Sequence, residues 1–240
     1  MSDRQSVGYS ETPLPRTVNT AVHAIRREAF VDVAIRLIQS RGYEQMSVQD
    51  VLDELDASRG AFYHYFDSKL ALLQAAVDHI VAAALEAVAP VAVDPTLPAL
   101  QKVERLFSGI AGWKAERREL MLALLEVWYS DDNAIVRDKV RRSTVTALVP
   151  LLSAIVEQGR IEGVFSASSP DGAARAVVAL LFGGQEMAGE LFFARRAGEI
   201  SYEVVVARMA GLAEALGRVL GAPEGSLSLI DDATLRLWFG

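Results

Sequence analysis

Residues 23–66 carry three helical patterns in succession, and the very short connection between the last two narrows the possible folds more than any other feature. The first pattern places its apolar residues at i, i+3, i+4, i+7 and i+8, which puts them on one face of a helix. These residues are Phe30, Val33, Ala34, Leu37 and Ile38. Gly42 follows as a helix stop. We therefore expect an amphipathic helix that begins near His23.

Two shorter helices are predicted directly after it. Ser47 precedes an apolar run that extends to Leu55, and Asp50 stands where the acid of a capping box belongs. Ser58 begins the segment SRGAFYHYF and can cap a third helix there. Asp56 lies in the turn between them, where aspartate tolerates the left-handed backbone region better than most residues. One longer helix followed by two short ones forms a tri-helical helix-turn-helix unit.

The rest of the chain also has helical periodicity, and no segment has the alternation of a strand. A fourth helix is predicted over residues 68–89, with Pro90 opening a connection. Further helices are predicted over residues 97–115, 118–130, 133–161, 170–196 and 201–220. The predicted fold is all-α. Its divisions are a flexible N-terminal arm over 1–20, a helix-turn-helix domain over 21–75 and a larger helical domain over 76–240.

Composition fits a protein with one main body and a smaller module. The 240 residues are 51% apolar and 23% charged, and none is cysteine, which fits a reducing compartment and favours a cytoplasmic location. The start of the sequence lacks the layout of a signal peptide. The longest uncharged stretch, residues 143–156, is too short to cross a bilayer of roughly 30 Å. We therefore expect no membrane segment.

Charge permits a nucleic-acid partner only at a segregated patch. A net charge of −7 would by itself argue against nucleic acid. Residues 16–41, however, contain five arginines and two acids. Arg26 and Arg27 in this segment suit contacts with a nucleic-acid backbone, although solvated surface charges are an equal alternative.

The third helix presents residues suited to DNA contacts. Arg59 lies at its start, where a guanidinium can pair bidentately with guanine. Tyr63 and His64 point outward, whereas the phenylalanines at 62 and 66 turn inward. Tyrosine hydroxyls are neutral donors to phosphates. Ordinary surface or core roles are the alternative for each of these residues.

The segment RREAFVDVAIRLIQSRGYEQMSVQDVLDELDASRGAFYHYFDSKLALLQAA resembles the DNA-binding domain of the TetR family of transcriptional regulators. The resemblance implies a homodimer whose recognition helices enter successive major grooves of a palindromic operator. It also implies a small-molecule effector in the larger domain. By position it assigns DNA contacts to Ser47, Gln49, Arg59, Tyr63, His64, Tyr65 and Lys69.

Three features depart from the family pattern. Asp56 stands where glycine is usual, and Ala61 replaces a small hydroxyl residue. The second helix is also unusually acidic, with Asp50, Asp53 and Glu54. These acids would repel DNA unless they point away from it.

Two stripes in the larger domain have the spacing of a helix-helix seam. The first comprises Ala174, Val178, Leu181, Gln185, Ala188 and Phe192. The second comprises Val204, Arg208, Gly211, Ala215 and Val219. Small residues on both allow close helix approach, as in a dimer interface with two helices from each subunit. Packing within one chain is the alternative.

Aromatic and polar residues within apolar helices are the signal for a ligand pocket. These are Phe107, Trp113, Met121, Glu126, Trp128, Tyr129, Gln185 and Glu186. Such a pocket is mostly apolar with a few orienting polar groups. The two glutamates would favour a cationic or hydroxylated ligand, and an ordinary core is the alternative.

The sequence therefore favours a ligand-responsive DNA-binding regulator, most often a repressor in this family. Neither a cofactor nor a metal site is expected, because there is no cysteine and all three histidines lie in the first third of the chain. No catalytic fingerprint supports an enzyme. The remaining alternative is a helical ligand-binding or interaction dimer that has lost DNA binding, which the acidic second helix motivates.

Overall fold

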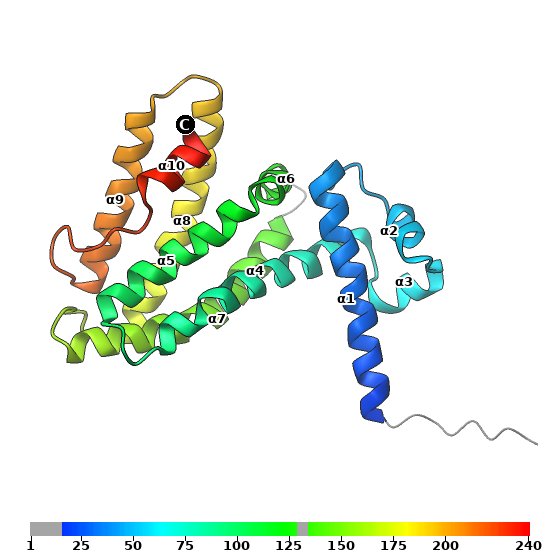
Figure 1. Ribbon diagram of the computed structural model, residues 1–240, viewed down its shortest axis with the longest axis horizontal. Helices are drawn as coiled ribbons and strands as arrows, with labels where there is room; N and C mark the ends of the chain where they lie inside the picture. The colour runs from blue at the N-terminus through cyan, green and yellow to red at the C-terminus, as the bar shows by residue number, and fades with distance from the viewer. Residues whose placement is uncertain (1–15, 129–133) are drawn as a thin grey trace, which may run out of the picture.

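The computed structural model describes residues 16–128 and 134–240, and these residues form ten α-helices and no strand. A helix-turn-helix unit lies at one end of the elongated molecule, and a larger helical body forms the rest (Figure 1). The helices are α1 (Arg16–Arg41), α2 (Val48–Leu55), α3 (Arg59–Tyr65), α4 (Lys69–Val93), α5 (Ala99–Glu116), α6 (Arg118–Trp128), α7 (Ala134–Ile161), α8 (Pro170–Arg196), α9 (Tyr202–Leu220) and α10 (Asp232–Phe239). The predicted all-α class is confirmed.

The helix-turn-helix unit has the caps that the sequence predicts. Ser47 and Asp50 form a reciprocal capping box at the start of α2. Asp56 ends α2 in the left-handed region, with φ 47° and ψ 47°. Ser58 accepts a hydrogen bond from the backbone of Ala61 and so caps α3. The connection from α2 to α3 is therefore locally encoded.

Two helix boundaries differ from the prediction. The first helix begins at Arg16, so residues 16–20 of the expected arm are helical, and residues 1–15 lie outside the described part of the chain. Residues 21–28 are exposed, so this part of α1 has no apolar face that the sequence could reveal. Helix α4 also continues past Pro90 to Val93. Pro90 is exposed and close to the helix end, where the loss of one backbone hydrogen bond costs least.

The larger body packs α4, α5, α7, α8 and α9 around one core, with α10 against α5, α8 and α9 (Figure 1). Among the described helices, α4 and α8 are long and apolar enough to cross a membrane by length and composition alone. Both pack on other helices of the body, α4 on α5 and α7, and α8 on α7 and α9. We therefore interpret them as core helices.

The C-terminal segment forms a helix that the periodicity did not predict. Asp231 accepts a hydrogen bond from the backbone of Thr234 and caps α10. Leu235 and Phe239 are buried against α8 and α9. The body of the chain therefore covers these two residues and Leu229, whereas Leu237 is 47% exposed.

Candidate functional site

The outer face of α3 carries the residues expected to contact DNA. Arg59, Tyr63 and His64 are all exposed, and Tyr63 has 56% of its surface accessible. Phe62, on the inner face, is buried against Phe30 of α1, with ring centroids 5.8 Å apart. This packing fixes α3 on α1. The short helix therefore presents one guanidinium, one phenol and one imidazole to solvent on a rigid support.

The acidic residues of α2 are held by partners within the domain. Arg41 Nη1 donates to Asp50 Oδ1 at 3.2 Å, and Arg36 Nη2 lies 3.2 Å from Glu54 Oε2. The Gln49 amide donates to Asp53 Oδ1 at 2.7 Å. Two of the three acids are therefore neutralised by arginines of α1. This pairing answers the expectation that an acidic second helix would repel DNA.

An aromatic cluster joins the N-terminal half of α1 to the recognition helix. The ring of His23 lies 4.5 Å from that of Tyr65 and 5.2 Å from that of His64, centroid to centroid. Tyr65 is half-buried and also packs on Phe30. Sequence reasoning did not single out His23. The only signal for His23 in the sequence was its position seven residues, or about two helical turns, before Phe30, which places both residues on the same face of α1.

The other residues expected at DNA phosphates have internal contacts. Lys69 donates to the carbonyl of Glu44 at 3.3 Å, and its ammonium lies 4.1 Å from the centroid of the Tyr43 ring. The guanidinium of Arg27 lies 5.1 Å from the centroid of the Phe66 ring. These contacts explain a lysine at a helix start without a phosphate. Arg26 is exposed on α1.

Ser47 and Gln49 lie near the start of α2, where the resemblance assigns them to DNA. The Ser47 hydroxyl accepts from the backbone of Asp50 at 3.1 Å and donates to its carboxylate at 2.6 Å. Both side chains are exposed but hydrogen-bonded to acids of the same helix. A contact with DNA at either position would compete with these bonds.

A cavity of about 1180 Å³ lies in the larger body, with walls from α4 to α10. Phe107, Trp113, Met121, Trp128 and Gln185 line it, so the structure brings together most of the residues expected at a ligand pocket. Glu186 is not part of the lining and is exposed on α8. The side chain of Glu126 and all of Tyr129 lie outside the described part of the structure.

Lys114 of α5 is the residue that the sequence analysis missed in this cavity. It occupies the apolar stripe of α5, at i+11 from Val103, after Phe107 and Ile110. By accessible surface area the Lys114 side chain is half-buried, because part of its surface faces the cavity. Protein nevertheless surrounds it, and desolvation by burial lowers the pKa of its ammonium below the ordinary value. A charged residue in an apolar register was the available signal.

The structure corrects one of the two expected dimer seams. Ala174 and Val178 of α8 are buried in the same core as Leu152 and Val156 of α7, so a second copy cannot reach them. The rest of that stripe, Leu181, Gln185, Ala188 and Phe192, lines the cavity. A stripe of small residues has the same spacing whether its partner is a helix of the same chain or of another.

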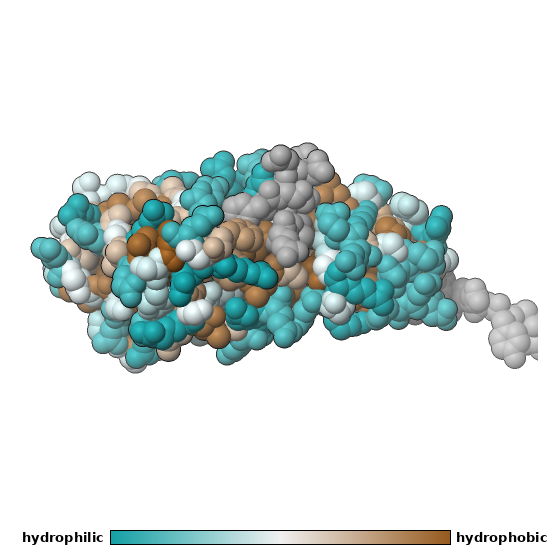
Figure 2. Space-filling model, turned by 90° about the horizontal axis from the view of Figure 1, so that it is seen from above, coloured by the Kyte–Doolittle hydropathy of each residue, from teal (hydrophilic) through white to brown (hydrophobic). Residues whose placement is uncertain are grey.

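The seam on α9 remains accessible at the surface. Arg208 and Gly211 are exposed, and Val204, Ala215 and Val219 are half-buried. No atom lies within 4 Å of the position that a Cβ would take at Gly211. From above, apolar side chains reach the surface of the larger body, whereas the helix-turn-helix end is mostly hydrophilic (Figure 2).

Comparison of sequences places the helix-turn-helix region among bacterial regulators. The family described as bacterial regulatory proteins, tetR family, matches residues 30–76. The uncharacterized HTH-type transcriptional regulator YuxN of Bacillus subtilis is 42% identical over 48 residues, which are 20% of this chain and 16% of that protein. An uncharacterized HTH-type regulator of Lactococcus lactis is 38% identical over 53 residues, 22% of this chain and 27% of that protein. The chain thus matches under a third of each of these relatives.

Comparison of structures extends the likeness to the whole fold. A TetR transcription regulator from Haloarcula marismortui covers 82% of this chain and 97% of its own, with TM-score 0.58 and 20% identity. A putative TetR-family regulator from Rhodococcus sp. covers 80% and 98%, with TM-score 0.54 and 25% identity. The SmeT–triclosan complex covers 85% and 95%, with TM-score 0.55 and 16% identity. The DNA-binding segment of this chain thus matches the tetR family of bacterial regulatory proteins, and its overall fold is similar to that of solved TetR-family regulators.

Proposed function

We propose that this protein is a cytoplasmic transcriptional regulator that binds a palindromic operator as a homodimer, represses transcription and is released by a small-molecule effector. The observation that carries the proposal is the exposed face of α3, where Arg59, Tyr63 and His64 project from a helix fixed on α1. An exposed guanidinium at the start of such a helix is suited to guanine in the major groove. Tyrosine and histidine add donors for phosphates or bases.

A homodimer is supported by the outer faces of α8 and α9, which pack side by side. Six of the exposed residues of α8 recur at alternating steps of three and four, the spacing of a helix-helix seam. They are Ala176, Ala179, Gly183, Glu186, Glu190 and Phe193. Gly183 on α8 and Gly211 on α9 both have open space where a Cβ would lie. Two such helices from each copy would form a four-helix interface.

Control by a ligand is supported by walls that the cavity shares with the DNA-binding domain. Leu73, Val77 and Ile80 of α4 line the cavity and also belong to the core cluster of the helix-turn-helix unit. Helix α6 likewise contributes Met121 to the cavity and packs on α1. A ligand that favours one arrangement of α4 and α6 would therefore shift the orientation of α3.

Relatives in fold support a small-molecule effector without identifying it. The solved SmeT structure is a complex with triclosan. The cavity of this chain is large enough for a drug-sized ligand, since such pockets span roughly 300–1,000 Å³. The second candidate is a helical dimer that binds ligand but not DNA. The arginine partners of Asp50 and Glu54 remove the main observation that favoured it.

The test is selection of fragments from a genomic DNA pool by the full-length protein at moderate salt. The proposed function predicts enrichment of a palindrome, with affinity that falls linearly with log salt. A reporter gene placed behind that palindrome should be repressed by the protein. If a folded dimer enriches no sequence at low or moderate salt, the protein is instead the ligand-binding dimer.

A further inference from the structure

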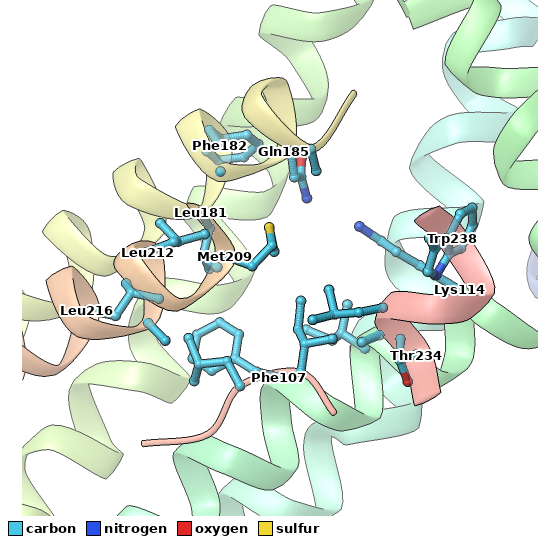
Figure 3. A pocket seen from close by; sticks show the side chains of 18 of the residues that line it. Phe107, Lys114, Leu181, Phe182, Gln185, Met209, Leu212, Leu216, Thr234 and Trp238 are labelled. Atoms are coloured by element: carbon cyan, nitrogen blue, oxygen red, sulfur yellow. The ribbon is translucent and has the colours of Figure 1, made fainter. Parts of the chain in front are cut away.

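The cavity has a polar end and an apolar end. Figure 3 shows the Lys114 ammonium of α5 and the Gln185 amide of α8 pointing into the same space from different walls, with Trp238 beside the lysine. Phe107, Leu212 and Leu216 lie together at the other side of the cavity, and Leu181 is close to them (Figure 3). A ligand that fills this space therefore meets one cation and one amide at one end and hydrocarbon at the other.

Most other charged side chains in the lining already have partners. Arg218 is bound to Glu214 at 2.5 Å, and Asp232 is bound at 2.7 Å to Arg236, which lies outside the lining; both pairs are one helical turn apart. Arg137 donates to the carbonyl of Trp128 at 2.5 Å. Glu224 is exposed on the loop after α9.

Lys114 differs from them. Among the side chains that the structure describes, no carboxylate lies within ion-pair distance of its ammonium, and no hydrogen-bond acceptor is found for it. The second buried lysine of α5, Lys102, is 4% exposed and donates to the carbonyl of Ala92 at 3.0 Å, away from the cavity. A desolvated cation without a partner is costly, and the chain retains Lys114 where an apolar residue would pack.

We propose that the cavity binds an amphipathic monocarboxylate, with the carboxylate between Lys114 and Gln185 and the apolar body against Phe107, Leu212 and Leu216. The carboxylate supplies the negative charge that Lys114 lacks, and the Gln185 amide donates to its second oxygen. One lysine and one amide match a single negative charge. If burial leaves the lysine neutral in the empty cavity, the ligand enters as the acid and transfers its proton to Nζ, so charge is conserved.

Glu126 and Glu186 led to the expectation of a cationic or hydroxylated ligand, and the side chain of Glu126 lies outside the described residues. Glu186 lies outside the lining, and the cation that faces the interior is Lys114. A positively charged ligand would bring two like charges together in an apolar space. The inference rests on the proposed function only for its consequence at the operator, because binding itself can be measured without DNA.

Binding is tested by titrating the full-length protein with dodecanoate and, in parallel, with dodecan-1-ol, which has the same chain and no charge. Tryptophan fluorescence reports the binding, because Trp113, Trp128 and Trp238 are all three tryptophans of the chain and all line the cavity. The variants are Lys114→Met and, as the matched control, Lys102→Met on the same helix. Circular dichroism shows whether each variant keeps its helical fold.

We expect saturable binding of dodecanoate, at least tenfold tighter than that of the alcohol. Lys114→Met should weaken dodecanoate at least tenfold and leave the alcohol unchanged, and Lys102→Met should bind both as the wild type does. Equal affinity for acid and alcohol, or dodecanoate affinity unaffected by Lys114→Met, overturns the proposal. If Lys114→Met fails to fold, Gln185→Leu replaces it, and a loss smaller than threefold for dodecanoate then overturns the proposal.

A second measurement separates this inference from the proposed function. Release of the protein from its selected operator is followed while dodecanoate is added. Carboxylate binding without release supports the inference and contradicts effector control. Release by uncharged or cationic compounds alone, with no dodecanoate binding, supports effector control and overturns the inference.

Discussion

Arg41, the last residue of α1, donates a hydrogen bond to Asp50 in the first turn of α2, with 3.2 Å between Nη1 and Oδ1. The other oxygen of the same carboxylate accepts from the backbone of Ser47 at 2.8 Å and from its hydroxyl at 2.6 Å. One carboxylate therefore caps α2 and holds it to α1. Because Phe62 of α3 packs on Phe30 of α1, α2 and α3 are both held on the same helix.

Removal of the Asp50 carboxylate should lower stability in a pH-dependent way. The Ser47 hydroxyl, then its backbone N–H, then Arg41 hold the pKa of Asp50 below its ordinary value. A carboxyl with a lowered folded pKa stabilises the fold above the unfolded pKa, near 4, and this contribution is lost as pH falls through the folded pKa. Asp50→Asn should therefore be less stable than the wild type at pH 7 and approach it at about pH 3.

Urea unfolding at both pH values measures this difference. The control is Asp53→Asn, which removes a carboxylate of the same helix outside the capping box. An equal loss in both variants at neutral pH would show that Asp50 has no special role. Ser47→Ala, which removes the other half of the box, should cost about 1 kcal/mol of unfolding free energy.

Arg59→Ala should weaken binding to the selected operator without changing the fold. The side chain is exposed at the start of α3, so its removal leaves no cavity. A bidentate contact with guanine contributes about 1–3 kcal/mol of discrimination, so we expect a loss of roughly tenfold or more and relaxed preference at one base pair. Fluorescence anisotropy with operator and point-substituted operators measures both effects. The matched control is Arg160→Ala, at the end of α7. If both variants bind the operator equally well, Arg59 does not contact DNA.

Gly211→Glu should convert the proposed dimer to a monomer. The Cβ position of Gly211 is open in the single chain, so a larger side chain is tolerated within α9. In a four-helix interface the same charge would meet the partner helix and lose its hydration. Analytical ultracentrifugation should show a dimer for the wild type and at least a tenfold weaker dimer for the variant. Ser108→Glu adds the same charge on exposed α5 and should leave the dimer intact.

Local signals explain what the sequence could predict. The capping box at Ser47, the left-handed Asp56 and the inward Phe62 follow from residues within a few positions of one another, and the structure contains all three. Long-range partners left no such signal. The stripe at Ala174 and Val178 has the same spacing for a partner in α7 as for a second copy, and only the folded chain distinguishes them.

The cavity shows the same division. Phe107, Trp113 and Trp128 were predictable because large aromatic residues within apolar helical patterns favour an interior. The role of Lys114 was not, because a lysine on an amphipathic helix ordinarily extends its ammonium to solvent. Helix α10 also covers the body near this lysine, and Trp238 comes from a tail whose helical period is only two turns long. Too short a period gives no pattern to recognise.

Lys114→Met should stabilise the ligand-free protein, and the gain should depend on pH. Burial lowers the pKa of Lys114 in the folded state, so between that pKa and about 10.4 the unfolded chain binds more protons than the folded one. Stability of the wild type therefore rises with pH across this window. The methionine variant lacks this dependence, and it should melt at a higher temperature than the wild type at pH 7, with the difference narrowing towards pH 10. Thermal unfolding at pH 7, 8.5 and 10 measures this difference in melting temperature.

The control is Lys102→Met, which loses a hydrogen bond to Ala92 and should instead melt at a lower temperature than the wild type. A lower melting temperature for Lys114→Met at pH 7 would show that its ammonium is satisfied in the folded chain, and the case for a missing counter-ion would fail with it.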